Sequence, residues 1–269
     1  MLGRVSARPP LVVLLAATLA LPSLAAAQDP PPGPCQDERA ALLLCPDLRM
    51  TAPYDLEIDR HTRRGRMLLR AANSIDSVGL GPAELVGRRD LRVGMRVVQR
   101  IHRRDGRSLA VPSTARLVLK NIPGQGPYWK LQDAARFELW RVNAAGARTR
   151  LVRRGPKVAY CLRDLRRRLG GRGSPRREVY PACSEDRRER AVRLGTSVGW
   201  SDVYPASYHE QWVDVTGLRG LFDLVHIADP RDGLEELDEA NNAASARMRL
   251  PLRRAPAREE EDEEYGGRR

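Results

Sequence analysis

The chain has 269 residues and is strongly basic, with 47 lysines and arginines against 34 aspartates and glutamates and a net charge of +13. A chain of this length can bury one sizeable hydrophobic core, and its charge favours anionic surfaces as partners. Aromatic residues are only 5% of the chain and no nucleic-acid recognition motif is present, so we exclude nucleic-acid binding.

Residues 1–27 have the organisation of a secretory signal peptide. Arg4 and Arg8 precede the apolar run LVVLLAATLAL, and a small-residue AAA stretch follows at 25–27. The apolar run is too short to cross a bilayer comfortably, although a retained N-terminal anchor is the alternative. No other segment predicts a membrane span. We expect cleavage near Gln28 and a mature protein that is secreted or lies in the periplasm or cell envelope.

Residues 28–44 follow as a proline-rich leader and a short helix. The leader is QDPPPGP, residues 28–34, and only DERAALLLC, residues 37–45, has a helical pattern.

The four cysteines are an even number in an exported chain, which predicts disulfides. The pairs Cys35–Cys45 and Cys161–Cys183 would close the shortest loops, but three connectivities are possible. The spacing lacks both the C-x-x-C pattern and the paired histidines of a zinc site.

Residues 45–252 are expected to form one β-domain. Short apolar and alternating runs lie between Gly, Pro and Asn turns, which is typical of an antiparallel β-sandwich. In ARFELWRV, for example, Phe137 and Leu139 lie on one face of a strand, and Arg136 and Glu138 lie on the other. We therefore predict a mainly β fold. The predicted strands lie within residues 65–82, 92–101, 115–122, 135–142, 210–218, 221–228 and 245–252.

Two highly charged segments lie outside this strand pattern. Residues 163–178, RDLRRRLGGRGSPRRE, predict a solvated basic loop, with a docking site for polyanions as the alternative. Residues 253–269 contain the acidic run REEEDEEYGGRR without an apolar face, which predicts a disordered tail.

An acidic cluster at residues 234–243, LEELDEANNA, is unusual in so basic a chain. Like charges repel one another unless something neutralises them, and hard divalent cations bind carboxylate, amide and carbonyl oxygens. The spacing E-x-D-x-x-N-N places Glu236, Asp238, Asn241 and Asn242 just before the last predicted strand. Two interpretations stay open at this point, a metal site and an asparagine-rich turn on a solvated loop.

Four motifs occur in an order that resembles the lysyl oxidase family in its bacterial branch, and the resemblance covers roughly residues 45–250. The motifs are CPDLRM, GPKVAYCLRD, GWSDVYPASYHEQWVDVTG and EELDEANN. The resemblance implies a secreted copper amine oxidase with a β-sandwich catalytic domain and a structural calcium site that ties the first strand to the last. The calcium ligands that it implies are Asp47, Leu48 through its carbonyl, Glu236, Asp238, Asn241 and Asn242.

The same resemblance implies a quinone cofactor made from the protein itself, lysine tyrosylquinone. Lys157 in GPKVAYC matches the position of the cofactor lysine, and Tyr204 in SDVYPASYHEQW matches that of the precursor tyrosine. In this family the quinone forms a Schiff base with lysine substrates, and hydrolysis then releases an aldehyde. Without the resemblance, an exposed lysine and a packed tyrosine would be the interpretation.

The sequence departs from the family at the copper site. Copper(II) is held there by an H-x-H-aromatic-H run, and the three ligand positions fall here on Gly126, Tyr128 and Lys130. Glycine offers no side-chain ligand, tyrosine is a poor one unless ionised, and a protonated lysine repels the cation. The loss of all three histidines predicts a lysyl-oxidase-like protein without amine oxidase activity, which acts as a binding or structural protein on an anionic envelope or extracellular component.

Four histidines remain elsewhere in the chain. His61 and His102 lie in Arg-rich stretches that are expected to be exposed. His209 is five residues beyond Tyr204 and is expected near the same cleft, whereas His226 is expected to pack within a strand. A copper site rebuilt from His209 and His226 is the alternative, and it would make the chain an active protein-lysine oxidase.

Overall fold

The computed structural model describes residues 32–89, 93–171 and 173–252. The predicted signal peptide, residues 1–27, and the predicted acidic tail, residues 253–269, lie outside these ranges. The described part is mainly β and its strand pairings are antiparallel, which confirms the fold class that the alternating runs predict.

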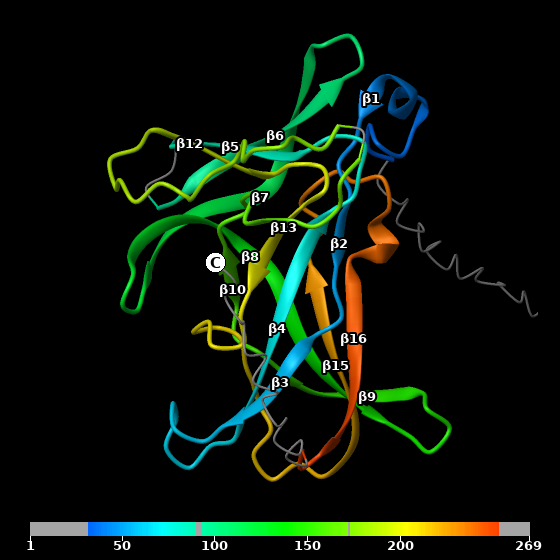
Figure 1. Ribbon diagram of the computed structural model, residues 1–269, viewed down its shortest axis with the longest axis vertical. Coiled ribbons are helices and arrows are strands. Elements are labelled where there is room, and N and C mark those ends of the chain that lie inside the picture. Colours follow the sequence, from blue (N-terminus) through cyan, green and yellow to red (C-terminus); the bar gives the residue numbers. More distant parts are fainter. Residues whose placement is uncertain (1–31, 90–92, 172, 253–269) are drawn as a thin grey trace, which may run out of the picture. The chain divides into compact units, whose positions relative to one another are not determined.

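The larger sheet has ten strands. They are β1 (Leu43–Leu44), β5 (Ala83–Arg88), β6 (Met95–Arg103), β7 (Ser108–Ile122), β8 (Gly126–Val142), β9 (Arg148–Arg154), β10 (Val158–Tyr160), β12 (Ala191–Thr196), β15 (Gly220–Ala228) and β16 (Ala243–Leu250). Their order is β12-β5-β6-β7-β8-β15-β16, with β1 paired to β6 and with β9 and β10 paired to β8 (Figure 1). The long strand β8 therefore joins several parts of the sheet.

The smaller sheet has six strands built around β4. They are β2 (Leu48–Met50), β3 (Tyr54–Asp59), β4 (Leu68–Ser77), β11 (Arg166–Arg167), β13 (Trp200–Tyr204) and β14 (Val213–Asp214). Strands β2 and β13 both pair with Ile75 and Asp76, so they lie on opposite edges of β4. This pairing brings the early strand β2 and the late strand β13 into one sheet.

Helical structure in the described part is limited to two 3-10 turns, η1 (Glu38–Leu42) and η2 (Glu239–Asn241). The helix expected over residues 37–45 is thus shorter than its sequence pattern suggests. Asp37 caps the turn through its side chain, but Leu43 and Leu44 leave the helix and pair with β6. The competing hydrogen bonds of a neighbouring strand therefore override the local helical pattern.

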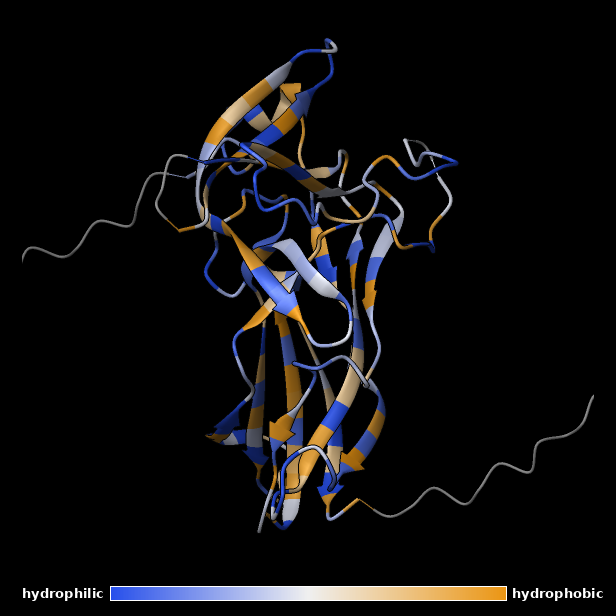
Figure 2. Cartoon of the chain, turned by 90° about the vertical axis from the view of Figure 1, so that its left-hand side faces the viewer, coloured by the Kyte–Doolittle hydropathy of each residue, from blue (hydrophilic) through white to orange (hydrophobic). Residues whose placement is uncertain are grey.

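The hydrophobic core lies between the two sheets. Leu69 and Ile75 of β4 belong to the same buried cluster as Phe137 and Leu139 of β8 and Phe222 of β15. Figure 2 shows the alternation of hydrophobic and hydrophilic residues along the strands that produces these faces. The predicted inward positions of Phe137 and Leu139 are confirmed, since their exposed fractions are 1% and 0%.

The opposite face of β8 is covered as well. Glu138 is buried there, and the guanidinium groups of Arg136 and Arg154 lie 3.0 and 3.3 Å from its carboxylate. A charged residue on the polar face of a strand is therefore enclosed by the long side chains of its neighbours.

Two disulfides join Cys35 to Cys45 and Cys161 to Cys183, which selects the near-neighbour pairing from the three possible connectivities. The second bond links the end of β10 to the loop that precedes β12. Within the described ranges, no helix is long and apolar enough to cross a membrane.

Candidate functional site

A cavity of about 440 Å³ opens beside the start of β8 and the ends of β7, β10 and β13. The polar and aromatic side chains that matter for its chemistry are Tyr128, Lys130, Arg163, Asp202, Tyr204, Tyr208 and His209. Asp202 and Tyr204 alternate with Val203 on β13, and Pro205 directly after Tyr204 lacks the amide hydrogen needed to continue the ladder.

Tyr204 lines this cavity and is held there by several contacts. Its ring stacks on Tyr160 with centroids 3.5 Å apart, and Tyr208 meets it edge-on at 5.0 Å. Its hydroxyl accepts a hydrogen bond of 2.8 Å from the backbone N–H of Cys161. Burial, with the charge of Asp202 adding to it, raises the pKa of Tyr204 well above its ordinary value, so the phenol stays protonated near neutral pH.

Lys130 reaches into the same aromatic group from β8. Its side chain is 4% exposed, and its Nζ donates a hydrogen bond of 2.8 Å to the hydroxyl of Tyr208. Nζ also lies 5.1 Å from the ring centroid of Tyr208 and 6.0 Å from that of Tyr204. Burial lowers the pKa of Lys130 to about 8, so an appreciable fraction of the amine is neutral near physiological pH.

Asp202 is the buried carboxyl group of this cavity. It is 1% exposed, and its Oδ2 has no hydrogen-bond partner within the described part of the chain. Burial raises the pKa of Asp202 to about 8. The cavity thus holds an amine and a carboxyl group that both titrate close to neutral pH, which is typical of sites that exchange protons.

Replacing the buried carboxyl, Asp202→Asn, is expected to remove a pH dependence of stability. The folded protein holds a proton on Asp202 that the unfolded chain loses above its ordinary pKa, so the free energy of unfolding falls as pH rises through this window, by up to about 1.4 kcal/mol per pH unit. Urea unfolding of both proteins between about pH 5 and about pH 8 measures this. The difference in free energy of unfolding between the two proteins should grow with pH. An equal dependence on pH in both would contradict a raised pKa at Asp202.

A second polar cluster lies where β2 meets the loop around η2. Glu236 is fully buried, and the backbone N–H of Leu48 donates to its carboxylate. Asn241 donates from Nδ2 to Asp47 Oδ1 at 2.8 Å and to Asp238 Oδ2 at 3.3 Å. Asn242 donates from Nδ2 to Glu236 Oε1 at 3.3 Å. All six residues expected to bind calcium therefore lie together in the structure.

This acidic loop carries buried groups that the chain itself leaves unsatisfied. The side-chain oxygens of Asn241 and Asn242 are buried without a hydrogen-bond partner in the described ranges. Burial raises the pKa of Glu236 well above its ordinary value, raises that of Glu239 to about 8, and also raises that of Asp47. Buried carboxylates and unpaired amide oxygens are the groups that a hard cation would satisfy.

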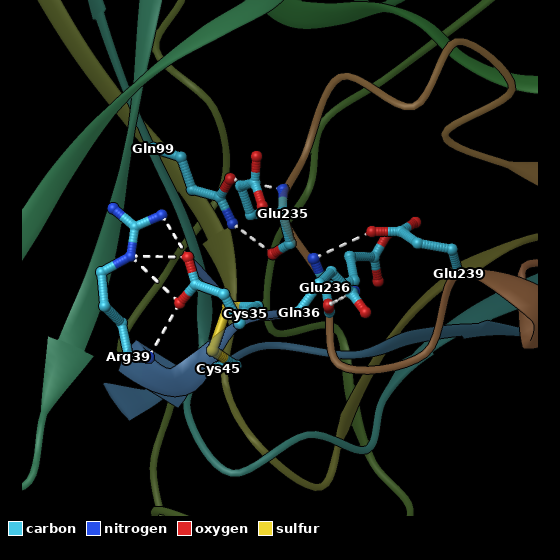
Figure 3. The surroundings of a disulfide bond; sticks show 9 residues. Cys35, Gln36, Arg39, Cys45, Gln99, Glu235, Glu236 and Glu239 are labelled. Carbon is cyan, nitrogen blue, oxygen red and sulfur yellow. Dashed lines mark hydrogen bonds and ion pairs between the residues drawn. A yellow bond between two sulfur atoms is a disulfide. The ribbon is translucent and has the colours of Figure 1, made fainter. Parts of the chain in front are cut away.

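The Cys35–Cys45 disulfide lies beside the acidic loop of residues 234–243, as Figure 3 shows. Gln36, next to Cys35, donates to the backbone carbonyl of Glu236. Gln99 of β6 donates to the carbonyl of Glu235 at 2.9 Å and accepts from its N–H at 2.7 Å. The backbone of the loop is thereby fixed by two glutamines from separate parts of the chain (Figure 3).

Comparison with known proteins decides the family. A model of the lysyl oxidase family matches residues 83–257, more than half of the chain. The chain belongs to the lysyl oxidase family. The match includes Lys157, Tyr204 and the acidic loop, but it begins after Asp47 and Leu48. No curated protein matches the chain. The family normally uses copper and lysine tyrosylquinone.

The three residues expected at the copper positions, Gly126, Tyr128 and Lys130, supply no donor set that suits copper. Gly126 begins β8 with a φ of +101°, a conformation that favours glycine. The Tyr128 hydroxyl donates to the carbonyl of Gln125 at 3.3 Å, and the Lys130 amine binds Tyr208. Copper(II) prefers imidazole ligands, so these three residues do not fit the ion.

The remaining histidines are dispersed. His209 lines the cavity beside Tyr204, as expected, and its Nδ1 is buried without a hydrogen-bond partner in the described ranges. His226 packs against Phe137 at 4.0 Å between ring centroids, and His102 contacts Glu84 at 2.9 Å, so it is tied to a carboxylate although the sequence suggests full exposure. His61 is exposed as expected. Across the described ranges, no group of three or more His, Cys, Asp or Glu side chains is arranged by itself to hold a metal ion. In the acidic loop, the amides of Asn241 and Asn242 lie against the carboxylates.

The two residues expected at the cofactor positions lie in different surroundings. Tyr204 is buried in the cavity, whereas Lys157 is exposed just before β10 and is not among the residues that line the cavity. The described residues give Lys157 no hydrogen bond or ion pair. Sequence reasoning did not single out Asp202 or Tyr208. The i, i+2 spacing of Asp202 and Tyr204 on one strand face was the signal that could have identified the former.

Proposed function

We propose that this member of the lysyl oxidase family is an exported binding or structural protein that has lost copper amine oxidation. Lys130 carries the proposal, because it stands where the resemblance expects a copper ligand and its amine is hydrogen-bonded to Tyr208. A cation in that place opposes binding of a second cation. The two disulfides support export, since such bonds persist in oxidising compartments.

Calcium is the metal that we propose for the acidic loop. Carboxylate oxygens of Asp47, Glu236 and Asp238, amide oxygens of Asn241 and Asn242 and the carbonyl of Leu48 would hold it. All are hard oxygen donors, and the number of ligands suits this ion. Calcium would supply the positive charge that offsets the buried carboxylates, and its role would be structural: it would fix β2 against the loop before β16.

The proposed partner is an anionic component of the cell envelope or the extracellular space. Within residues 163–178 the side chains of Arg166, Arg167, Arg168 and Arg177 are exposed. A cluster of exposed guanidinium groups attracts polyanions and repels lysine-rich proteins, which are the substrates expected of an active family member. Binding of this kind should weaken steeply with salt.

Incubating the purified protein with copper(II) in air, followed by peptide mapping with mass spectrometry, tests the loss of oxidase chemistry. We expect Lys157 and Tyr204 in separate, unmodified peptides, and no peroxide release with a simple alkylamine. A crosslinked Lys157–Tyr204 peptide would overturn the proposal. It would favour the alternative of an active protein-lysine oxidase, to which His209 could contribute its unpaired nitrogen.

A further inference from the structure

The chain uses lysine very sparingly. Of its 47 lysines and arginines, only three are lysines, at positions 120, 130 and 157. Arginine supplies the positive charge elsewhere, and it differs from lysine in having no amine that can lose its proton near neutral pH. The three lysines are therefore the side chains of this basic chain whose amines can become neutral nucleophiles, and one of them lies inside the cavity.

The three lysines differ in their surroundings. Lys157 is exposed, and Lys120 is partly exposed and paired with Glu210. Lys130 alone is almost completely buried, with its amine among the tyrosine rings and within hydrogen-bond distance of the Tyr208 hydroxyl. Burial lowers the pKa of Lys120 as well, but the Lys120 amine is paired with Glu210. No carboxylate of the described residues contacts the Lys130 amine, and a desolvated amine near other cations is a better nucleophile at neutral pH.

A second cation in the cavity is available to a ligand. Arg163 lines the cavity, and its charge acts on both Asp202 and Lys130, but no carboxylate within the described ranges forms a direct ion pair or hydrogen bond with it. A guanidinium group binds carboxylates through two parallel hydrogen bonds. Asp202 adds an unpaired carboxyl oxygen, which can accept or return a proton beside the amine. The cavity volume of about 440 Å³ is in the range of small-molecule sites.

We propose that Lys130 forms a reversible imine with a small carbonyl compound that carries a carboxylate, such as a 2-oxo acid, and that Arg163 binds the carboxylate. The neutral Nζ adds its electron pair to the carbonyl carbon as the C=O π bond breaks. The nitrogen gives up one proton and the oxygen takes up one. The resulting carbinolamine then loses water as the C=N bond forms. Hydrolysis reverses these steps, and no oxidant or reductant takes part. The inference rests on the proposed function, because it requires the cavity to be free of copper.

Reductive trapping tests the proposal on the full chain. The protein is incubated with pyruvate and cyanoborohydride in an amine-free buffer that contains a copper-selective chelator, and the adduct is mapped by mass spectrometry. We expect labelling at Lys130 to exceed labelling at Lys157 by at least about tenfold, a ratio that corresponds to about 1.4 kcal/mol. Lys157 is the internal control for simple exposure. Equal labelling of the two lysines, labelling of Lys157 alone, or no adduct at Lys130 would overturn the proposal.

Two variants sharpen the test. Lys130→Arg keeps the charge but cannot form an imine, so the adduct at position 130 should vanish. Thermal unfolding of this variant checks that it still folds. Arg163→Gln should lower pyruvate labelling of Lys130 about tenfold and leave labelling by acetone, which has no carboxylate, unchanged. An equal effect on both reagents would overturn the role of Arg163.

The same peptide maps separate the two proposals. Unmodified Tyr204 and Lys157 with no adduct at Lys130 would reject the imine and leave the proposed function intact. A Lys157–Tyr204 crosslink in the copper experiment would reject the proposed function itself.

Discussion

The substitution Glu236→Gln is expected to abolish stabilisation by calcium. At a calcium concentration about 100 times the Kd, a folded-state ligand adds about 2.7 kcal/mol to the free energy of unfolding. In a domain of this size that corresponds to a rise in Tm of about 5–10 °C. Glu236 is fully buried at the centre of the proposed ligand set, so glutamine removes the charge that the ion needs. Thermal unfolding of chelator-treated protein with and without calcium measures the effect.

Without calcium, the order of stability should reverse, with Glu236→Gln more stable than the wild type at neutral pH. Burial raises the pKa of Glu236, so the metal-free wild type loses stability as pH rises above the ordinary carboxyl pKa, and the variant does not. Glu57→Gln, on the exposed face of β3, is the matched control and should keep the calcium response. If the wild type takes up no calcium by isothermal titration, or if Glu236→Gln gains as much Tm as the wild type, the calcium site is wrong.

Removing the second disulfide with the double substitution Cys161→Ala and Cys183→Ala is expected to lower the free energy of unfolding by about 3 kcal/mol, or Tm by about 6–12 °C. The bond closes a loop with a sequence separation of 22 residues. Both cysteines line the cavity, and the N–H of Cys161 holds the Tyr204 hydroxyl. Urea unfolding measures the stability, and mapped nitration of tyrosines measures the accessibility of Tyr204.

The first disulfide is the control for this experiment. Cys35→Ala with Cys45→Ala opens a loop with a separation of 10 residues and should cost a similar free energy. Cys35 and Cys45 belong to a separate buried cluster, so Tyr204 should remain protected from nitration. Equal nitration of Tyr204 in the two double variants would show that the second disulfide does not shape the cavity.

Features encoded by local patterns could be predicted from the sequence. The alternation in ARFELWRV places Phe137 and Leu139 in the core, because the two-residue period of a strand fixes which side chains share a face. The E-x-D-x-x-N-N spacing brings Glu236 and Asn242 into one cluster, because residues so close in a loop sequence cannot lie far apart in space. Asp47, the distant member, was found only through the resemblance to a family.

Features that depend on contacts between distant residues could not be predicted. Lys130 and Tyr208 are 78 residues apart, and nothing in either local sequence indicates their hydrogen bond. The burial of Asp202 likewise follows from β13 pairing with β4, and that pairing is decided by the whole sheet. The sequence around Leu43 predicts a helix. The prediction is wrong there because Leu43 pairs with a strand that lies some 60 residues later, which the local sequence does not indicate.

The join between β2 and the acidic loop has a consequence for the order of assembly. Gln36 and Leu48 bond to Glu236 across separations of 200 and 188 residues. A chain emerges from its N-terminus, so these two hydrogen bonds can form only after almost the whole domain has followed, although β2 can pair with β4 much earlier. The Cys35–Cys45 loop is short enough to close early, and closure restricts the conformations open to this segment. Completion of this join thus depends on residues close to the end of the domain. A chain that stopped before Glu236 would leave the side chain of Gln36 and the backbone N–H of Leu48 without these hydrogen-bond acceptors.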